Sequence, residues 1–362
     1  MSTLPRTRIV SACLAFTIAC SASGASIDDA AREYVRLARA AGRHDRAYRD
    51  EIAAALRTVA GFASAESRGA FLLAQLAALD RQAAVLAGEP RSIRDEAAML
   101  GLPIPRYDAA LAAGLRRQLD AALEGSAALP RKLAAHRRAA AVPRSRLDAV
   151  ATAAVEYCRA RTPLPSGTID GGIELRYVVD RPWPAYTTYQ GNGRSLVEIR
   201  RDVAWLEEDL LTVVCHETYP GHHFQHLIWE AVQRVHGWVE LTVVPPFTPQ
   251  AIAAERAAIA GTRLIRPDRE RPAVSRILDA LAPLALATAI DVVDGRLPRP
   301  EGLARLRDEL LMPDAEGFLS FVERYRSMAV AYVTPLAGVS DLDEYVALLR
   351  SPTGLIRIQP VQ

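Results

Sequence analysis

Lysine is almost absent from this chain of 362 residues. Lys132 is the only lysine, and the other residues among the 44 basic ones are arginines. The 42 acidic residues bring the formal net charge to only +2. A protein that binds nucleic acid usually carries an excess of positive charge or a basic stripe. Neither is present here, so the composition argues against a nucleic-acid partner.

Cysteine is also scarce, with four residues in the whole chain. Cys13 and Cys20 lie in an N-terminal segment that we expect to be processed, which leaves Cys158 and Cys215 in the mature chain. One pair is not the disulfide framework that holds small secreted domains together. Because Cys215 lies within an apolar helical pattern, we predict that both cysteines are buried thiols in the core.

The chain also lacks the strongly hydrophobic composition of a membrane protein with many spans. Half of the residues are hydrophobic and 24% are charged, and the mean hydropathy is +0.04. Such a chain can bury one large core or two modest ones. It is too polar for a protein that crosses a membrane several times.

The N-terminal segment 1–25 has the features of an export signal. Arg6 and Arg8 precede an apolar stretch, 9–20, that is too short to span a bilayer, and a run of small residues follows it. Residues 16–20 also resemble a bacterial lipobox, whose cysteine becomes the lipidated N-terminus. We therefore predict an exported bacterial protein, either free in the periplasm or anchored in the membrane as a lipoprotein through Cys20.

The rest of the chain reads as mainly helical. Between residues 27 and 160, apolar residues recur at spacings of three and four, as in 71–79 and 111–123. Glycine and proline at 88–90, 101–105 and 129–130 divide this stretch into helices of ordinary length. We predict a mainly α fold, with an N-terminal helical region over 26–162 and a catalytic region over 163–362.

A short stretch of β pattern interrupts the helices. Residues 173–179 and 195–200 alternate between apolar and polar and are rich in β-branched side chains, and the segment between them contains turn formers and aromatics. These features predict two or three short strands in a small sheet. Its edge could hold an extended peptide by strand addition.

The chemistry is concentrated just after this sheet. Five of the seven histidines lie between residues 216 and 236. His216 and Glu217 follow a helical pattern that begins at residue 206, and they place an imidazole ligand beside a carboxylate that could act as a base. In the usual zincin pattern the second histidine stands four residues later, where this chain has Pro220.

Two histidines could replace that missing ligand. On an ideal helix, the seventh residue after His216 lies about 20° from it in azimuth and about 10.5 Å further along the axis, while the sixth lies about 120° away. A regular helix therefore favours His223, whereas a bulge at Pro220 and Gly221 favours His222. A third possibility is that these histidines only pack in the core and bind no metal.

Residues 216–225 read His-Glu-Thr-Tyr-Pro-Gly-His-His-Phe-Gln. This run resembles the His-Glu-x-x-Pro-Gly-His-His-x-Gln signature of the bacterial family of unknown function 885, which is grouped with the gluzincin-like metallopeptidases. The resemblance extends upstream over 182–195 and downstream over 247–255, and it is looser in the helical front half. It implies a multi-helix, zincin-like (gluzincin) fold, bound Zn²⁺ and peptide hydrolysis.

The resemblance also implies roles for residues outside the motif. Glu255 matches the third metal ligand, although Arg256 stands where the family usually has glycine. Tyr332, with Tyr325 as the second choice, matches an aromatic that could donate to the oxyanion of the transition state. Tyr186 and Tyr189 could line the groove that binds the substrate.

Together these features predict an exported, zinc-dependent metallopeptidase that acts on short peptides. His216, either His222 or His223, and Glu255 would hold the metal, and Glu217 would be the general base. The alternative is an envelope lipoprotein that binds metal or peptide without catalysis, a reading that Arg256 favours. The same metal site would also support amide or ester cleavage in a substrate that is not a peptide.

Overall fold

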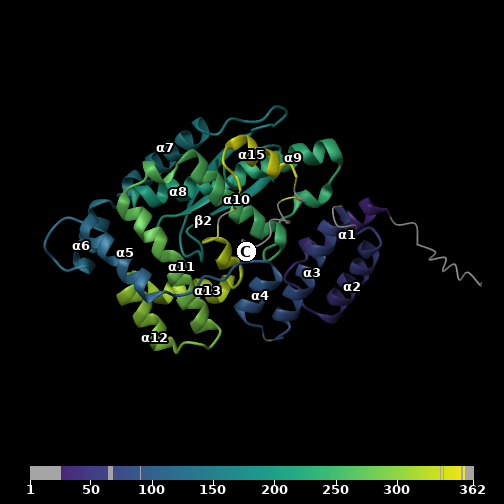
Figure 1. Ribbon diagram of the computed structural model, residues 1–362. Coiled ribbons are helices and arrows are strands. Elements are labelled where there is room, and N and C mark those ends of the chain that lie inside the picture. The colour runs from purple at the N-terminus through teal and green to yellow at the C-terminus, as the bar shows by residue number, and fades with distance from the viewer. Residues whose placement is uncertain are drawn as a thin grey trace, which may run out of the picture.

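The computed structural model describes residues 26–63, 68–89, 91–334, 336, 338–351 and 354. Over these residues the chain is mainly helical with one small sheet, which confirms the predicted fold class (Figure 1). The export segment 1–25, with Cys20, lies outside the described residues, so its signal and lipidation stay predictions.

The elements follow one another in three groups. The helices before the sheet are α1 (Ile27–Arg39), α2 (Arg46–Ala60), α3 (Arg68–Leu86), α4 (Ile93–Met99), α5 (Ala109–Ala122), α6 (Leu129–Ala139), η1 (Arg144–Arg146) and α7 (Leu147–Ala160). The strands are β1 (Gly172–Val178), β2 (Ala185–Gly191) and β3 (Arg194–Arg200). The elements after the sheet are α8 (Glu207–Glu217), α9 (His222–His236), η2 (Val239–Thr242), α10 (Pro249–Ile265), η3 (Asp268–Glu270), α11 (Ala273–Val293), α12 (Arg299–Ala304), η4 (Arg305–Glu309), α13 (Ala315–Tyr325), α14 (Met328–Ala331) and α15 (Leu342–Leu349).

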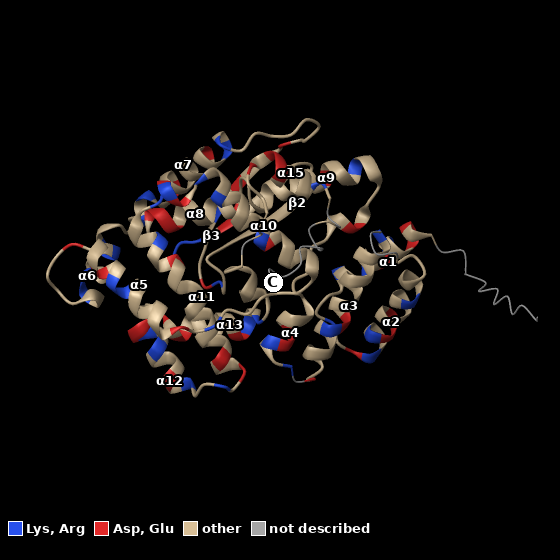
Figure 2. Cartoon of the chain, viewed as in Figure 1, with Lys and Arg blue, Asp and Glu red and all other residues tan. Residues whose placement is uncertain are grey.

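Local signals set the ends of the front helices. Ser26, Asp45 and Asp108 each accept a hydrogen bond from a backbone N–H of the first turn, which caps α1, α2 and α5. The predicted breaks also fall where expected, since α3 ends at Leu86 and α6 begins at Leu129. Charges of both signs are mixed over the helices (Figure 2), in keeping with the absence of a basic stripe in the sequence.

The largest core cluster joins both halves of the chain. It includes Tyr34 and Leu72 from the front helices and Trp229 and Tyr345 from the helices after the sheet, all of them fully or almost fully buried. α11 is long and apolar enough to cross a membrane by length and composition. Half of its most apolar 18-residue stretch is buried, however, and the helix packs against α5 and α13, as a core helix does.

A disulfide joins Cys158 on α7 to Cys215 on α8, so the prediction of two free thiols is wrong. Both residues are fully buried, as predicted. The apolar pattern showed that Cys215 faces the core, but it held no information about which residue of another helix lies opposite. By the loop-entropy argument, a bond between cysteines 57 residues apart stabilises the fold by about 4 kcal/mol.

The small sheet positions one strand beside the functional helices. β3 lies in the centre, with β1 parallel to it on one side and β2 antiparallel on the other. β2 and β3 form a hairpin whose turn contains Gly191, Asn192 and Gly193, all with positive φ. β2 contacts α8 and α9, and its outer edge pairs with no other described strand.

Candidate metal centre

The helix that carries His216 is interrupted directly after the His-Glu pair. α8 ends at Glu217, and α9 begins only at His222. Across the break, Gly221 N donates to Cys215 O at 3.2 Å and Phe224 N donates to Thr218 O at 3.1 Å. These bonds each span six residues, whereas those of a regular α-helix span four. The break therefore changes the direction in which His222 and His223 point.

Gly221 makes this break possible because its backbone lies against α8. A Cβ built on Gly221 would stand only 1.7 Å from the carbonyl oxygen of His216. The carbonyl belongs to the helix backbone and cannot move aside without disturbing His216 itself. The position accepts no side chain in this geometry.

We expect Gly221→Ala to destabilise the fold by about 3 kcal/mol or more, because the methyl group must displace backbone atoms. Denaturant unfolding followed by circular dichroism measures this free energy. Gly114→Ala on α5 is the matched control, since its Cβ would meet no atom closer than 3.9 Å and alanine favours a helix by up to about 1 kcal/mol. Equal unfolding midpoints for the two variants would contradict the close approach.

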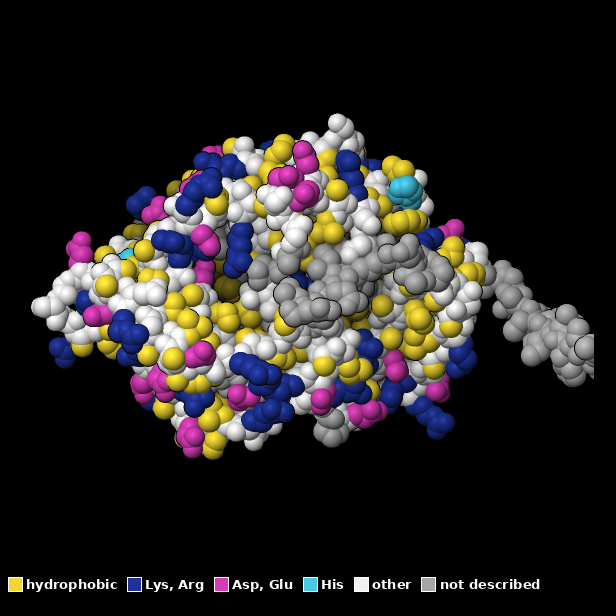
Figure 3. Space-filling view, in the orientation of Figure 1, with side chains coloured by type: hydrophobic (Ala, Val, Ile, Leu, Met, Phe, Trp, Pro, Cys, Tyr) yellow, Lys and Arg dark blue, Asp and Glu magenta, His cyan; other side chains and the backbone are white. Residues whose placement is uncertain are grey.

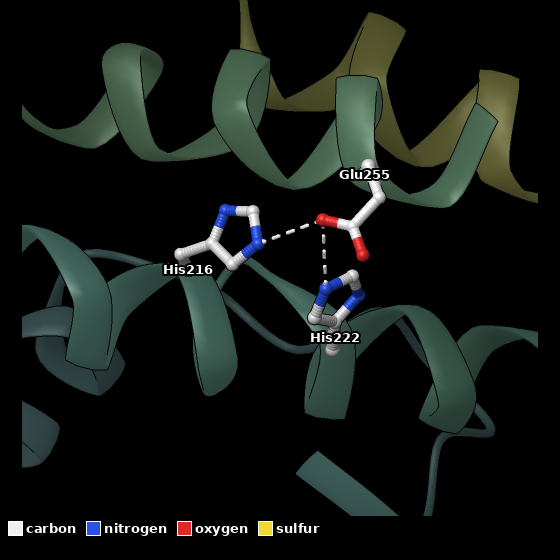
Figure 4. A group of neighbouring side chains, drawn as sticks. All are labelled: His216, His222 and Glu255. Carbon is white, nitrogen blue, oxygen red and sulfur yellow. Dashed lines mark hydrogen bonds and ion pairs between the residues drawn. The ribbon is translucent and has the colours of Figure 1, made fainter. Parts of the chain in front are cut away.

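Three side chains from three helices meet beside the break (Figure 4). The Nε2 atom of His216 lies 3.1 Å from Oε2 of Glu255, and Nε2 of His222 lies 3.5 Å from the same oxygen. The two imidazole rings stand edge to face with their centroids 4.7 Å apart. All three possible ligand atoms lie within 4.8 Å of one another. The structure thus brings together His216, Glu255 and one of the two histidines considered for the remaining position.

The charges within this group stabilise one another. Burial disfavours the charged form of His222, but the negative charge of Glu255 outweighs that effect and raises the pKa of His222 to about 9. Burial likewise opposes ionisation of Glu255, yet the charge of His222 and the contact with His216 hold the pKa of Glu255 well below its usual range. Without a metal, Glu255 and His222 therefore form a partly buried ion pair at the wall of a cavity.

Gln225 orients His222. Its Oε1 atom lies 3.3 Å from Nδ1 of His222, and its amide Nε2 donates to the backbone oxygen of Ala254 at 2.9 Å. Because the amide nitrogen faces that carbonyl, Oε1 is left to accept a hydrogen bond from Nδ1 of His222. In the neutral form of His222, which is the form that binds a metal, the lone pair then lies on Nε2, the nitrogen that faces Glu255. Sequence reasoning had noted Gln225 only as part of the motif.

His223 lies elsewhere, in a separate buried network. Its Nδ1 is 2.8 Å from Oγ of Ser195 on β3, and its Nε2 is 3.4 Å from Oδ1 of Asp170. Its ring stands edge to face against Tyr219, and the residue has no exposed surface. The geometry therefore favours His222 over His223 as a partner of His216 and Glu255.

Glu217 is held by the neighbouring strand. Oγ1 of Thr187 on β2 lies 2.7 Å from Oε2 of Glu217 and 2.8 Å from its backbone oxygen. Both residues are largely buried, and both line the cavity that His222 and Glu255 also line. Sequence reasoning missed Thr187, because nothing in a short alternating strand indicates which of its side chains meets a carboxylate.

A cavity of about 390 Å³ opens beside these residues and is lined by Glu217, His222 and Glu255, together with Tyr186, Tyr325 and Tyr332. The ring of Tyr332 lies 6.4 Å from that of His216, centroid to centroid. Burial, followed by the charges of Glu255 and Glu217, raises the pKa of Tyr332 well above its usual value. Its hydroxyl therefore stays protonated and can donate a hydrogen bond.

The two tyrosines predicted to line a substrate groove lie in different surroundings. Tyr186 is 52% exposed and stacks on Trp183 at the cavity wall. Tyr189 instead donates to Oε2 of Glu230 at 2.5 Å and stacks on His226. It lines an adjoining cavity of about 420 Å³, which Tyr186 also borders.

Arg256, which directly follows Glu255, does not narrow the cavity. Its side chain is buried, and its Nε donates to the backbone oxygen of Thr334 at 2.7 Å. It is absent from the residues that line the cavity. The neighbouring arginine thus leaves the space in front of Glu255 open.

Comparison with known proteins adds information on the fold alone. No family model matches the chain, and no curated protein matches it either, so the resemblance to family 885 stays a prediction. A solved structure with a similar fold is titled "The crystal structure of the putative lipoprotein from Colwellia psychrerythraea". It shares 11% sequence identity at a TM-score of 0.50, over 91% of this chain and 68% of that one.

Proposed function

We propose that this chain is an exported, zinc-dependent hydrolase with a gluzincin-like site that cleaves amide bonds in short peptides. The observation that supports this most strongly is the convergence of His216, His222 and Glu255. Glu217 directly follows His216 in the chain and lines the same cavity as His222 and Glu255. The buried disulfide favours an exported location, because such bonds form in oxidising compartments.

The donor set fits zinc. Two imidazole nitrogens and one carboxylate oxygen are the protein ligands of many hydrolytic zinc sites, which keep a further position for water or substrate. Two ligands about 2.1 Å from a tetrahedral zinc ion lie about 3.4 Å from each other. The two nitrogen-to-oxygen distances of 3.1 and 3.5 Å lie on either side of that value.

The residues of the cavity would divide the work of hydrolysis. Zinc, when bound, supplies a Lewis acid that polarises the carbonyl and makes water a better nucleophile. Glu217 accepts a proton from the attacking water and passes it to the leaving nitrogen, while Thr187 fixes its carboxylate. Tyr332 donates to the carbonyl oxygen as negative charge develops there. The free edge of β2 would hold the substrate backbone in an extended form.

Thr187 acts in this scheme as a positioning residue. We expect Thr187→Val to lower kcat about tenfold, because a hydrogen bond to a charged group is lost, while KM and the melting temperature change little. Steady-state kinetics and thermal unfolding measure the three quantities. Thr187→Ser keeps the hydroxyl and should restore the rate, and Thr188→Val, at an exposed position of the same strand, is the control. A Ser variant as slow as the Val variant would contradict the role.

A second candidate is an envelope lipoprotein that binds metal or peptide without catalysis. The fold similarity to a structure titled as a lipoprotein is the observation in its favour. That candidate predicts the same metal centre but no hydrolysis that depends on Glu217.

Elemental analysis of the purified mature protein, combined with cleavage of a fluorogenic peptide library, tests both candidates. The proposed hydrolase should hold about one zinc ion per chain and lose its cleavage activity to a chelator. Bound zinc without cleavage would favour the lipoprotein candidate. A folded protein that takes up no zinc after metal is added would exclude the hydrolase and the metal-binding form of the lipoprotein.

A further inference from the structure

A second, smaller cavity of about 170 Å³ adjoins the metal-site cavity. Its walls come from α3, α4, the end of α13 and the turn that follows α13, and they include the apolar residues Ala78, Val85, Leu86, Met99 and Leu100. Phe247 and Arg324 line this cavity and the metal-site cavity alike. The two spaces are therefore neighbours, and one extended ligand could reach from one into the other.

Arginines without acidic partners surround this second cavity, which we call the arginine pocket. Arg81, Arg91 and Arg324 line it, and none of them forms an ion pair with any residue that the structure describes. The one acidic residue in its lining, Glu96, is paired with Arg326 at 2.7 Å. Figure 3 shows basic side chains gathered beside hydrophobic ones over the region of α4 and α13.

This arrangement is unfavourable without a ligand. Arg81 is half-buried. Burial, followed by the positive charge of Arg91, lowers the pKa of its guanidinium by more than the negative charge of Asp80 raises it. Desolvating a charge without a partner costs free energy, and a second charge of the same sign adds to the cost. A carboxylate would offset both effects, since it matches the planar fork of a guanidinium.

The backbone at the pocket is strained as well. Phe247 has φ 62° and Arg326 has φ 48°, in the left-handed region that bulky residues rarely adopt. Conformations of this kind are unfavourable for residues other than glycine and gather at functional sites. Arg326 is held there by Glu96 and by the backbone oxygen of Arg91. Both strained residues line the arginine pocket.

We propose that the arginine pocket is a subsite that binds a carboxylate carried on an apolar stem, at one end of a peptide that occupies the metal-site cavity. The carboxylate is either the side chain of an acidic residue or the C-terminus of the peptide. Arg81 and Arg324 bind it, while the apolar walls contact the stem. The identity of the ligand as a peptide rests on the proposed function.

Binding of defined peptides to the zinc-loaded, full mature protein carrying Glu217→Gln tests this, because that background should bind peptides without cleaving them. The probes are fluorescein-labelled, alanine-rich octapeptides that carry one Glu, either near the N-terminus or near the C-terminus. A matching set of peptides has Gln in place of the Glu. Each is made with a free and with an amidated C-terminus. Fluorescence anisotropy gives the dissociation constants.

We expect a peptide with the recognised carboxylate to bind roughly tenfold more tightly than its uncharged counterpart. This is the usual contribution of one hydrogen bond to a charged group. The double variant Arg81→Gln/Arg324→Gln should reduce this preference to below about twofold. Arg57→Gln, which removes one positive charge from an exposed position of α2, should keep it. A preference for Glu over Gln identifies a side chain as the ligand, and a preference for free over amidated peptides identifies the C-terminus.

Equal binding of all four peptide types, or a preference that survives in the double variant, would overturn the proposal. Thermal unfolding checks that the variants are folded, and the two single variants provide the same test should the double variant unfold. Zinc content and hydrolysis by the wild-type protein are measured in parallel. If the protein prefers acidic peptides but holds no zinc and hydrolyses no peptide, the proposal for the arginine pocket is supported and the proposed function is contradicted. If the protein hydrolyses peptides but has no preference for acidic ones, the proposed function is supported and the proposal for the arginine pocket is contradicted.

Discussion

Replacing Glu217 with Gln is expected to lower kcat for peptide hydrolysis by about a thousandfold, within the range for the loss of a general base. Glutamine has nearly the same shape and can still accept the hydrogen bond from Thr187, but it cannot take a proton from water. Since Glu217 is not one of the three clustered ligands, the zinc content should stay the same. Steady-state kinetics and elemental analysis of the same preparation measure the two effects.

Glu207→Gln provides the control, because Glu207 lies in the exposed first turn of the same helix and carries the same charge. It should leave both kcat and zinc content at the wild-type values. Hydrolysis that persists in Glu217→Gln would show that another group activates the water, or that the activity comes from a contaminant.

The second large effect separates two adjacent histidines. His222→Ala should lower zinc affinity by more than about 100-fold, because it removes a direct ligand, and replacing even an indirect partner typically costs 10- to 100-fold. His223→Ala should keep the zinc, because His223 faces Asp170 and Ser195 instead of Glu255. A competition titration with a chromogenic chelator measures both affinities.

Stability should respond in the opposite order. His223→Ala leaves buried polar groups of Asp170 and Ser195 short of a partner, so we expect a loss of about 2 kcal/mol or more in the free energy of unfolding. His222→Ala removes an ion-pair partner of Glu255, but Glu255 keeps its contact with His216 and faces a cavity that water can enter, so this variant should cost less in the absence of metal. If His223→Ala lost the zinc and His222→Ala kept it, the arrangement in Figure 4 would not be the metal-binding one.

Much of the fold was predictable because its signals are local. The apolar spacing of residues 71–79 and 111–123 predicted helices that the structure shows as parts of α3 and α5. The alternation over 173–179 and 195–200 predicted β1 and β3. β2 was less evident, since its residues lie within a stretch rich in turn formers and gain their strand geometry from pairing with β3.

The candidate site was predictable only in part. The motif placed His216, Glu217, His222 and His223 together, because all of them lie within eight consecutive residues. The resemblance to family 885 added Glu255, and the structure places that carboxylate against His216 and His222. The division of the chain at residue 162 stays a prediction, although one core cluster combines residues from both sides of it.

The sequence by itself determined the helical class, the small sheet before the functional helix and the residue types of the site, because each depends on neighbours along the chain. The tertiary structure decided which histidine faces Glu255, which threonine holds Glu217, where Arg256 points and that the two cysteines are bonded. These features depend on how separate helices pack against each other and on a break after Glu217 that alters the direction of every later side chain. No periodicity within a single segment contains that information.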